Sequence, residues 1–194
     1  MQNQRPDRIR KLLADLVAFD TVSDRSNLPL IDYIERYLAS LGVSGQRIVD
    51  DTGQKSSLWV TIGPQDKAGL VLSGHTDVVP VAGQDWTHNP FELVERDGKL
   101  YGRGTTDMKG FVAVCLAMVP EMVEVNLKTP IHLAISYDEE VGCVGVRPML
   151  REVARKSVKP LGCFVGEPTR MQVIIGHKRS EEHTSELQSR SDLV

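Results

Sequence analysis

The sequence predicts an α/β domain built on a mixed, mostly parallel sheet. Apolar runs of strand length alternate with amphipathic segments of helical period along most of the 194 residues. Several runs end directly in histidine or acidic residues, as strands do when their carboxyl ends meet at one functional edge of a sheet. With 41% hydrophobic residues, the chain can bury one substantial core or form part of a larger domain.

The individual patterns place the elements in order along the chain. Amphipathic helices are predicted over residues 9–17, 30–41, 111–125 and 146–156. Strands are predicted over residues 43–49, 57–62, 70–80, 131–137 and 161–165. Asn27 is placed to cap the second helix, and Gly42 stands where a helix would end in a left-handed residue.

Composition narrows the class of partner. The formal net charge is -3, only 5% of residues are aromatic and no basic stripe is present, which argues against nucleic acid or a membrane surface and favours a small molecule. No apolar run approaches the roughly 18 residues of a membrane span, and no signal peptide is indicated, so we expect a cytoplasmic location. The odd, widely spaced Cys115, Cys143 and Cys163 predict buried free thiols.

The central feature is LVLSGHTDVVP, residues 70–80, in which an apolar strand delivers His75 and Asp77 into a cleft. Side chains at positions i and i+2 of an extended segment face the same way, so Asp77 can reach the imidazole of His75. A metal-bound histidine usually gives its second ring N–H to a carboxylate, and this pair has that form. Taken alone, however, a His-x-Asp pattern is more often a surface pair.

Acidic residues follow three further segments, at Asp107, at Asp138–Glu140 and at Glu167. Any one of them could simply cap a helix or top a solvated turn. In open α/β sheets the ligand site lies beyond the carboxyl ends of the strands, so these acids and His75 predict a single cleft.

Residues 82–103 form a long irregular connection, and such connections are usually functional or disordered. Their Gly and Trp content argues against plain disorder. We interpret His88, which lies here, as a solvated surface residue outside the site. Gly102-Arg103-Gly104 precedes a helix as in dinucleotide sites, but the third glycine and the ribose-binding acid are out of register, so that interpretation is rejected.

These motifs resemble the dinuclear-zinc metallopeptidase family of acetylornithine deacetylases, succinyl-diaminopimelate desuccinylases, aminoacylases and related carboxypeptidases. The resemblance runs from about Pro6 to Lys178 and is carried by SGHTDVVPV, YGRGTTDMKGF, SYDEEVGCVGVR and VGEPT followed by IGHK, which look most like acetylornithine deacetylases. It implies a three-layer, zinc-peptidase-like catalytic domain. The implied reaction is hydrolysis of a small N-acyl amino acid, N-acetyl-L-ornithine, to L-ornithine and acetate in arginine biosynthesis. Desuccinylation or another N-acyl amino acid is the alternative.

The resemblance also implies a role for each candidate residue. Four would ligate two zinc ions, for which cobalt could substitute: His75 and Glu167 on the first, Glu140 on the second and Asp107 bridging both. Asp77 would orient His75, and Asp107 would be followed by an unusual cis peptide. Glu139 would be the general base that takes a proton from the shared water.

Members of the family are longer than this chain and homodimeric, with an inserted dimerisation domain and a returning segment that supplies a histidine to the second metal. Neither is expected here, so residues 1–178 are predicted to be the N-terminal part of a catalytic domain with an incomplete second metal site. Such a fragment would be a metal-binding chain without turnover. Residues 179–194 resemble the translation of a sequencing-library adapter and are predicted to be a non-native tail, with a natural disordered tail as the alternative.

Overall fold

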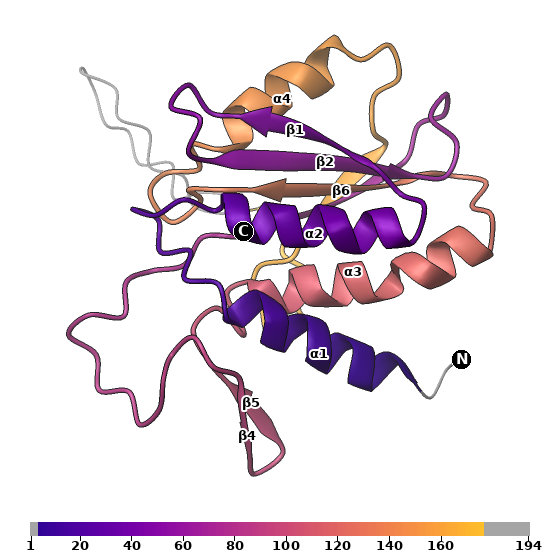
Figure 1. Cartoon of the computed structure of the whole chain (residues 1–194). Helices are drawn as coiled ribbons and strands as arrows, with labels where there is room; N and C mark the ends of the chain where they lie inside the picture. The colour runs from indigo at the N-terminus through magenta and orange to yellow at the C-terminus, as the bar shows by residue number, and fades with distance from the viewer. Residues whose placement is uncertain (1–3, 177–194) are drawn as a thin grey trace.

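The centre of the structure is a mixed sheet of five strands in the order β1-β2-β6-β3-β7 (Figure 1). It is a computed structural model that describes residues 4–176, so the predicted tail over residues 179–194 lies outside the described residues. The strands are β1 (Gly45–Val49), β2 (Ser56–Ile62), β3 (Leu70–His75), β6 (Ile131–Ser136) and β7 (Gly162–Val165). Strand β3 runs parallel to β6 and β7, whereas the β1–β2 and β2–β6 pairings are antiparallel. The predicted mixed α/β sheet is confirmed.

Helices cover both faces of the sheet and complete the predicted three layers. One face carries α1 (Arg5–Val17), α2 (Leu28–Ser40) and α3 (Lys109–Glu124), and the other carries α4 (Val146–Arg155) (Figure 1). Alternate residues of a strand face opposite sides of a sheet. Leu58 and Val60 of β2 therefore join the large core beneath α1–α3, whereas Trp59 packs with Met149 of α4.

Helix length bears on the membrane expectation. The longest described helix, α3, has 16 residues. Among residues 4–176, no helix combines the length and apolar character that crossing a bilayer requires.

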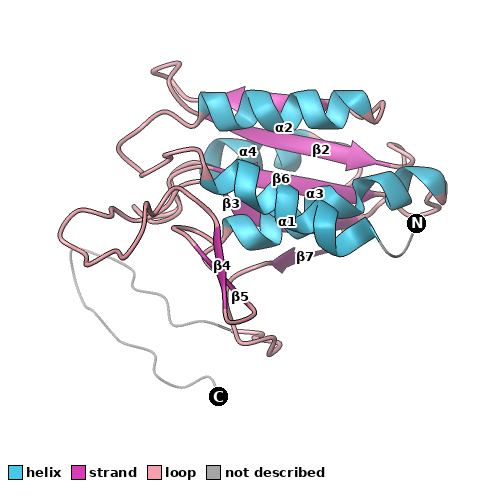
Figure 2. Ribbon diagram, turned by 60° about the horizontal axis from the view of Figure 1, so that its bottom comes forward, coloured by secondary structure: helices cyan, strands magenta, loops and turns pink. Residues whose placement is uncertain are grey.

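The connection over residues 82–103 contains a short hairpin that the sequence analysis did not predict. Strands β4 (Val94–Arg96) and β5 (Lys99–Tyr101) pair antiparallel and stand apart from the main sheet (Figure 2). Asp97 and Gly98 form the turn, with φ of 53° and 69°. Positive φ at both central residues is what a tight two-residue hairpin turn requires, and Asp-Gly is a favoured pair for it.

Helix α2 spans Leu28–Ser40 where residues 30–41 were predicted, and one predicted contact is wrong. Asn27 is the N-cap residue, yet its side chain makes no capping hydrogen bond. Its amide instead donates to the Ser56 carbonyl oxygen at 2.9 Å and to Thr76 Oγ1 at 3.0 Å, and its Oδ1 accepts from Ser56 N–H at 2.9 Å. Buried polar groups are almost always hydrogen-bonded, and the Asn27 side chain supplies such bonds to Ser56 and Thr76. Gly42 has the predicted left-handed conformation, with φ of 71°.

The prediction of three buried thiols holds for one cysteine only. Cys115 of α3 is buried, whereas Cys143 and Cys163 are exposed, and all three are free. Cys143 lies in the turn after the acidic residues, and Cys163 lies on β7, whose four residues are all exposed. Local apolar sequence did not reveal that β7 is an edge strand.

Candidate metal centre

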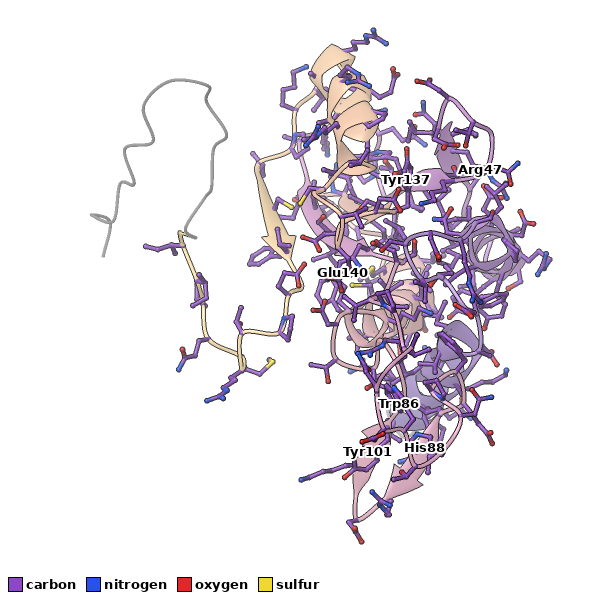
Figure 3. The ribbon with its side chains drawn as sticks, turned by 90° about the vertical axis from the view of Figure 1, so that its left-hand side faces the viewer. Arg47, Trp86, His88, Tyr101, Tyr137 and Glu140 are labelled. Atoms are coloured by element: carbon purple, nitrogen blue, oxygen red, sulfur yellow. The ribbon has the colours of Figure 1, made fainter. Side chains whose placement is uncertain are left out.

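The carboxyl ends of the parallel strands bring the predicted site residues together at one edge of the sheet. His75 is the last residue of β3, the acidic turn Asp138–Glu140 follows β6, and Glu167 follows β7. Asp107 arrives from the segment just before α3. Figure 3 looks onto this edge, with Glu140 near the middle of the view.

Two groups of side chains are spaced as metal ligands would be. One comprises His75, Glu139 and Glu167, and the other comprises His75, Asp107 and Glu140, with the ligand atoms in each group within 4.8 Å of one another. Glu139 thus lies as close to His75 Nε2 as Glu167, an acid that the resemblance implies to be a ligand. Imidazole nitrogen with carboxylate oxygens is a donor set that suits zinc and related divalent ions.

His75 lies at the centre of both groups and is almost completely buried. Its Nε2 atom lies 3.1 Å from Asp107 Oδ1 and 3.8 Å from both Glu139 Oε2 and Glu167 Oε1. Burial alone would lower the pKa of His75, but the hydrogen bond and charge of Asp77, with the charges of Glu167 and Glu139, outweigh it and raise the pKa to about 9. A metal ion bound at Nε2 would take the place of that proton.

Asp77 holds both the imidazole and the acidic turn. His75 Nδ1 lies 2.9 Å from the Asp77 carbonyl oxygen and 3.3 Å from its Oδ1, so the predicted contact between the two residues is confirmed. The same carboxylate accepts the backbone N–H groups of Glu139 and Glu140 at 3.0 and 3.1 Å, and the Ser23 hydroxyl at 2.8 Å. Burial raises the pKa of Asp77, but the His75, Glu139 and Ser23 hydrogen bonds lower it below its usual value.

The acids at this edge repel one another. Burial, followed by the charge of Asp107, raises the pKa of both Glu140 and Glu167, and His75 offsets only part of this. A divalent cation among these carboxylates would reverse that repulsion, because an opposite charge favours their ionised form. The residues present therefore fit a metal ion.

The segment that carries Asp107 is tightly packed although Asp107 itself is half-exposed. The peptide bond between Asp107 and Met108 is cis, as the resemblance implied, and Met108 is fully buried. Lys109 is also buried, and its ammonium group donates to the Phe19 carbonyl oxygen at 2.7 Å. Burial lowers the pKa of Lys109 to about 7, against the opposing charges of Asp20 and Asp77.

The sequence did not mark two of these supporting residues, Ser23 and Lys109. Ser23 donates to Asp77 across 54 positions of the chain, and Lys109 reaches Phe19 across 90. Contacts over such distances along the chain follow no sequence spacing, so neither Ser23 nor Lys109 could be identified from a motif. One signal was available for Lys109, because it stands at the start of an apolar helix. Lysine is rarely buried unless its charged group has a partner.

His88 belongs to neither ligand group. It is half-buried rather than fully solvated, with its ring edge-on to Trp86 at 5.7 Å between centroids. The Arg103 guanidinium also contacts Trp86, since it lies 5.2 Å from the centre of that ring. Trp86 thus contacts both His88 and Arg103 within the 82–103 connection.

Comparison with known proteins agrees with this geometry. The sequence model of Peptidase family M20/M25/M40 matches residues 71–186. The chain belongs to this family. It is 38% identical over 172 residues to acetylornithine deacetylase of Proteus mirabilis (strain HI4320), covering 87% of this chain and 43% of that protein. It is 36% identical over 197 residues to acetylornithine deacetylase of Shigella sonnei (strain Ss046), covering 98% and 50%.

The fold is likewise that of the family. The crystal structure of the M20 family metallo-carboxypeptidase Sso-CP2 from Sulfolobus solfataricus superposes with a TM-score of 0.72 at 21% identity, covering 82% of this chain and 37% of that one. The chain spans about half the length, or less, of the curated relatives it matches. It therefore carries the part of the M20 fold that holds the acidic edge.

Proposed function

We propose that this chain is the N-terminal part, residues 1–178, of the catalytic domain of a metal-dependent amide hydrolase. The whole protein would convert N-acetyl-L-ornithine to L-ornithine and acetate, in arginine biosynthesis and in the cytoplasm, as a homodimer. The observation that carries this proposal is the convergence of His75 with four carboxylates from three chain segments. The two acetylornithine deacetylases at 36% and 38% identity support the choice of acyl group and amino acid.

The donor set supports a centre of two zinc ions, with cobalt as a substitute. His75 and Glu167 would hold the first ion, Glu140 the second, and Asp107 would bridge them. When bound, two such ions lower the pKa of a shared water and polarise the carbonyl of the scissile amide.

The residues of this chain would do the rest of the chemistry. Glu139 would take the proton of the attacking water and deliver it to the departing amine, the task of a general acid–base residue. Asp77 would keep the Nδ1 side of His75 occupied, so that Nε2 faces the metal. Because Asp77 also accepts the Glu139 and Glu140 amides, it would align the base and a ligand through the same carboxylate.

The test is made on the full-length protein, expressed from the complete reading frame and loaded with zinc. Acetate release from N-acetyl-L-ornithine is compared with succinate release from N-succinyl-diaminopimelate. We expect a preference of at least about tenfold in kcat/KM for the acetyl substrate, roughly 1.4 kcal/mol of differential transition-state binding. Equal values, or the reverse order, would reject the deacetylase assignment.

A further inference from the structure

Lys55 lies directly before β2, and its ammonium group contacts two segments that surround the metal centre. It donates to both carboxylate oxygens of Asp138, at 2.6 and 2.7 Å, and to the carbonyl oxygen of Ser23. The side chains of Lys55 and Asp138 are only 16% and 15% exposed. This is an ion pair largely withdrawn from water, in which removal of one partner leaves the other charge uncompensated.

Asp138 is also the residue at which the chain turns out of β6 toward the site. Its φ is 52°, in the left-handed region that non-glycine residues adopt uncommonly, although aspartate does so more readily than most. That turn directs the next two backbone N–H groups, of Glu139 and Glu140, onto the Asp77 carboxylate. Backbone strain of this kind persists where the surrounding contacts over-determine the conformation.

The acidic turn is therefore held at two points by one connected network. Asp77 holds its backbone, and Lys55 holds the Asp138 side chain. Ser23 joins the two holds, since its carbonyl oxygen accepts from Lys55 while its hydroxyl donates to Asp77. Lys55 also neutralises the Asp138 carboxylate beside an edge that is already crowded with negative charge.

We infer that Lys55 and Asp138 are a positioning pair that sets the orientation of Glu139 and Glu140 in the metal centre. The inference rests on the proposed function and deepens it. Neither residue belongs to either ligand group. Their effect passes through the backbone of the turn, where a displacement of about 1 Å in a catalytic group can cost on the order of 10²-fold in rate.

The experiment uses the full-length protein and three substitutions. Lys55→Met removes the charge and keeps the apolar stem, Asp138→Asn removes the other partner, and Lys55→Arg keeps the charge. Lys67→Met is the matched control, because Lys67 is an exposed lysine beyond the other end of β2. Zinc affinity is measured by competition with a chelator, kcat and KM with N-acetyl-L-ornithine, and the folded fraction by urea unfolding.

We expect Lys55→Met and Asp138→Asn each to lower kcat by roughly 10–100-fold per folded molecule while KM changes less than about threefold. Zinc affinity should fall by up to about 10–100-fold, the range found when groups that orient metal ligands are removed. The double variant, which combines Lys55→Met with Asp138→Asn, should lose little more kcat than either single variant, because the two residues act as a unit. Lys55→Arg should keep most of the wild-type kcat, and Lys67→Met should match the wild type in kcat and zinc affinity.

A purely structural pair would behave differently, reducing the folded fraction without changing kcat or zinc affinity per folded molecule. That result, or an equal loss in Lys67→Met, would overturn the inference. Failure of the proposed function is a separate result, since it would appear as a wild-type protein that does not hydrolyse N-acetyl-L-ornithine. In that case the zinc-affinity comparison still decides whether Lys55 and Asp138 position the acidic turn.

Discussion

Strands β2 and β7 belong to the same sheet but have opposite surroundings. Six of the seven residues of β2 are buried, whereas all four residues of β7 are exposed. The strands that lead to the metal-site residues differ in the same way. His75 and the acidic turn are attached to strands packed in the core and are held by Asp77, but Glu167 follows the exposed strand. Ligands that lie within a few ångströms of one another therefore follow strands of very different burial.

The largest expected effect separates the two acids that share a ligand group with His75. In the full-length protein, Glu139→Gln should lower kcat by about 10²–10⁴-fold, the usual contribution of a general acid–base residue, while zinc stays bound. Glu167→Gln should instead weaken zinc binding, because it removes a charged donor. The measurements are acetate release and elemental analysis of zinc. Loss of zinc from Glu139→Gln would show that the base and ligand roles are wrongly assigned.

The second prediction compares packing at the two strands directly, in the 194-residue chain. Leu58→Ala in β2 should cost about 2–5 kcal/mol of unfolding free energy, because it leaves a cavity in a fully buried site. Phe164→Ala in β7, where the side chain is 60% exposed, should change the free energy by about 0.5 kcal/mol or less. Urea unfolding gives both values. Similar losses would mean that β7 is covered in solution and that the contrast between the strands is wrong.

A smaller effect concerns pH in the metal-free chain. The pKa of His75 is raised from 6.5 to about 9 in the folded state, so its contribution to stability is fully present below about pH 6.5 and is lost as pH rises through about 9. The loss should be on the order of 3 kcal/mol. Unfolding free energies measured from pH 6 to 10 in the presence of a chelator test this, and His75→Asn should flatten the profile. A wild-type profile as flat as that of the variant would refute the assignment.

The sequence predicted the four helices and the five strands of the main sheet, but not the β4–β5 hairpin, because helical and strand periodicity are local properties. It also placed His75 and Asp77 together, since alternate residues of an extended segment share a face. The convergence of the acids followed from a single topological rule about strand ends. Each of these inferences needed no knowledge of which segments pack against which.

What the sequence did not show depends on such packing. The Glu139 and Glu140 amides that bind Asp77, and the Lys55–Asp138 pair, join residues more than 60 positions apart. Asn27 lies at the helix end as expected, but its side chain bonds Ser56 and Thr76 rather than the first turn of α2. Cys163 was expected to be buried because its neighbours are apolar, although β7 has a paired strand on one side only.

The most direct test of the account is the number of zinc ions that the 194-residue chain binds. If His75, Asp107 and Glu167 hold one ion while the second is left with Asp107 and Glu140, native mass spectrometry should find at most about one tightly bound zinc per chain. That zinc should be lost in His75→Ala and kept in His88→Ala. Two tightly bound zinc ions would contradict the prediction that the second site is incomplete in this chain, and one that survives His75→Ala would contradict the proposed role of His75.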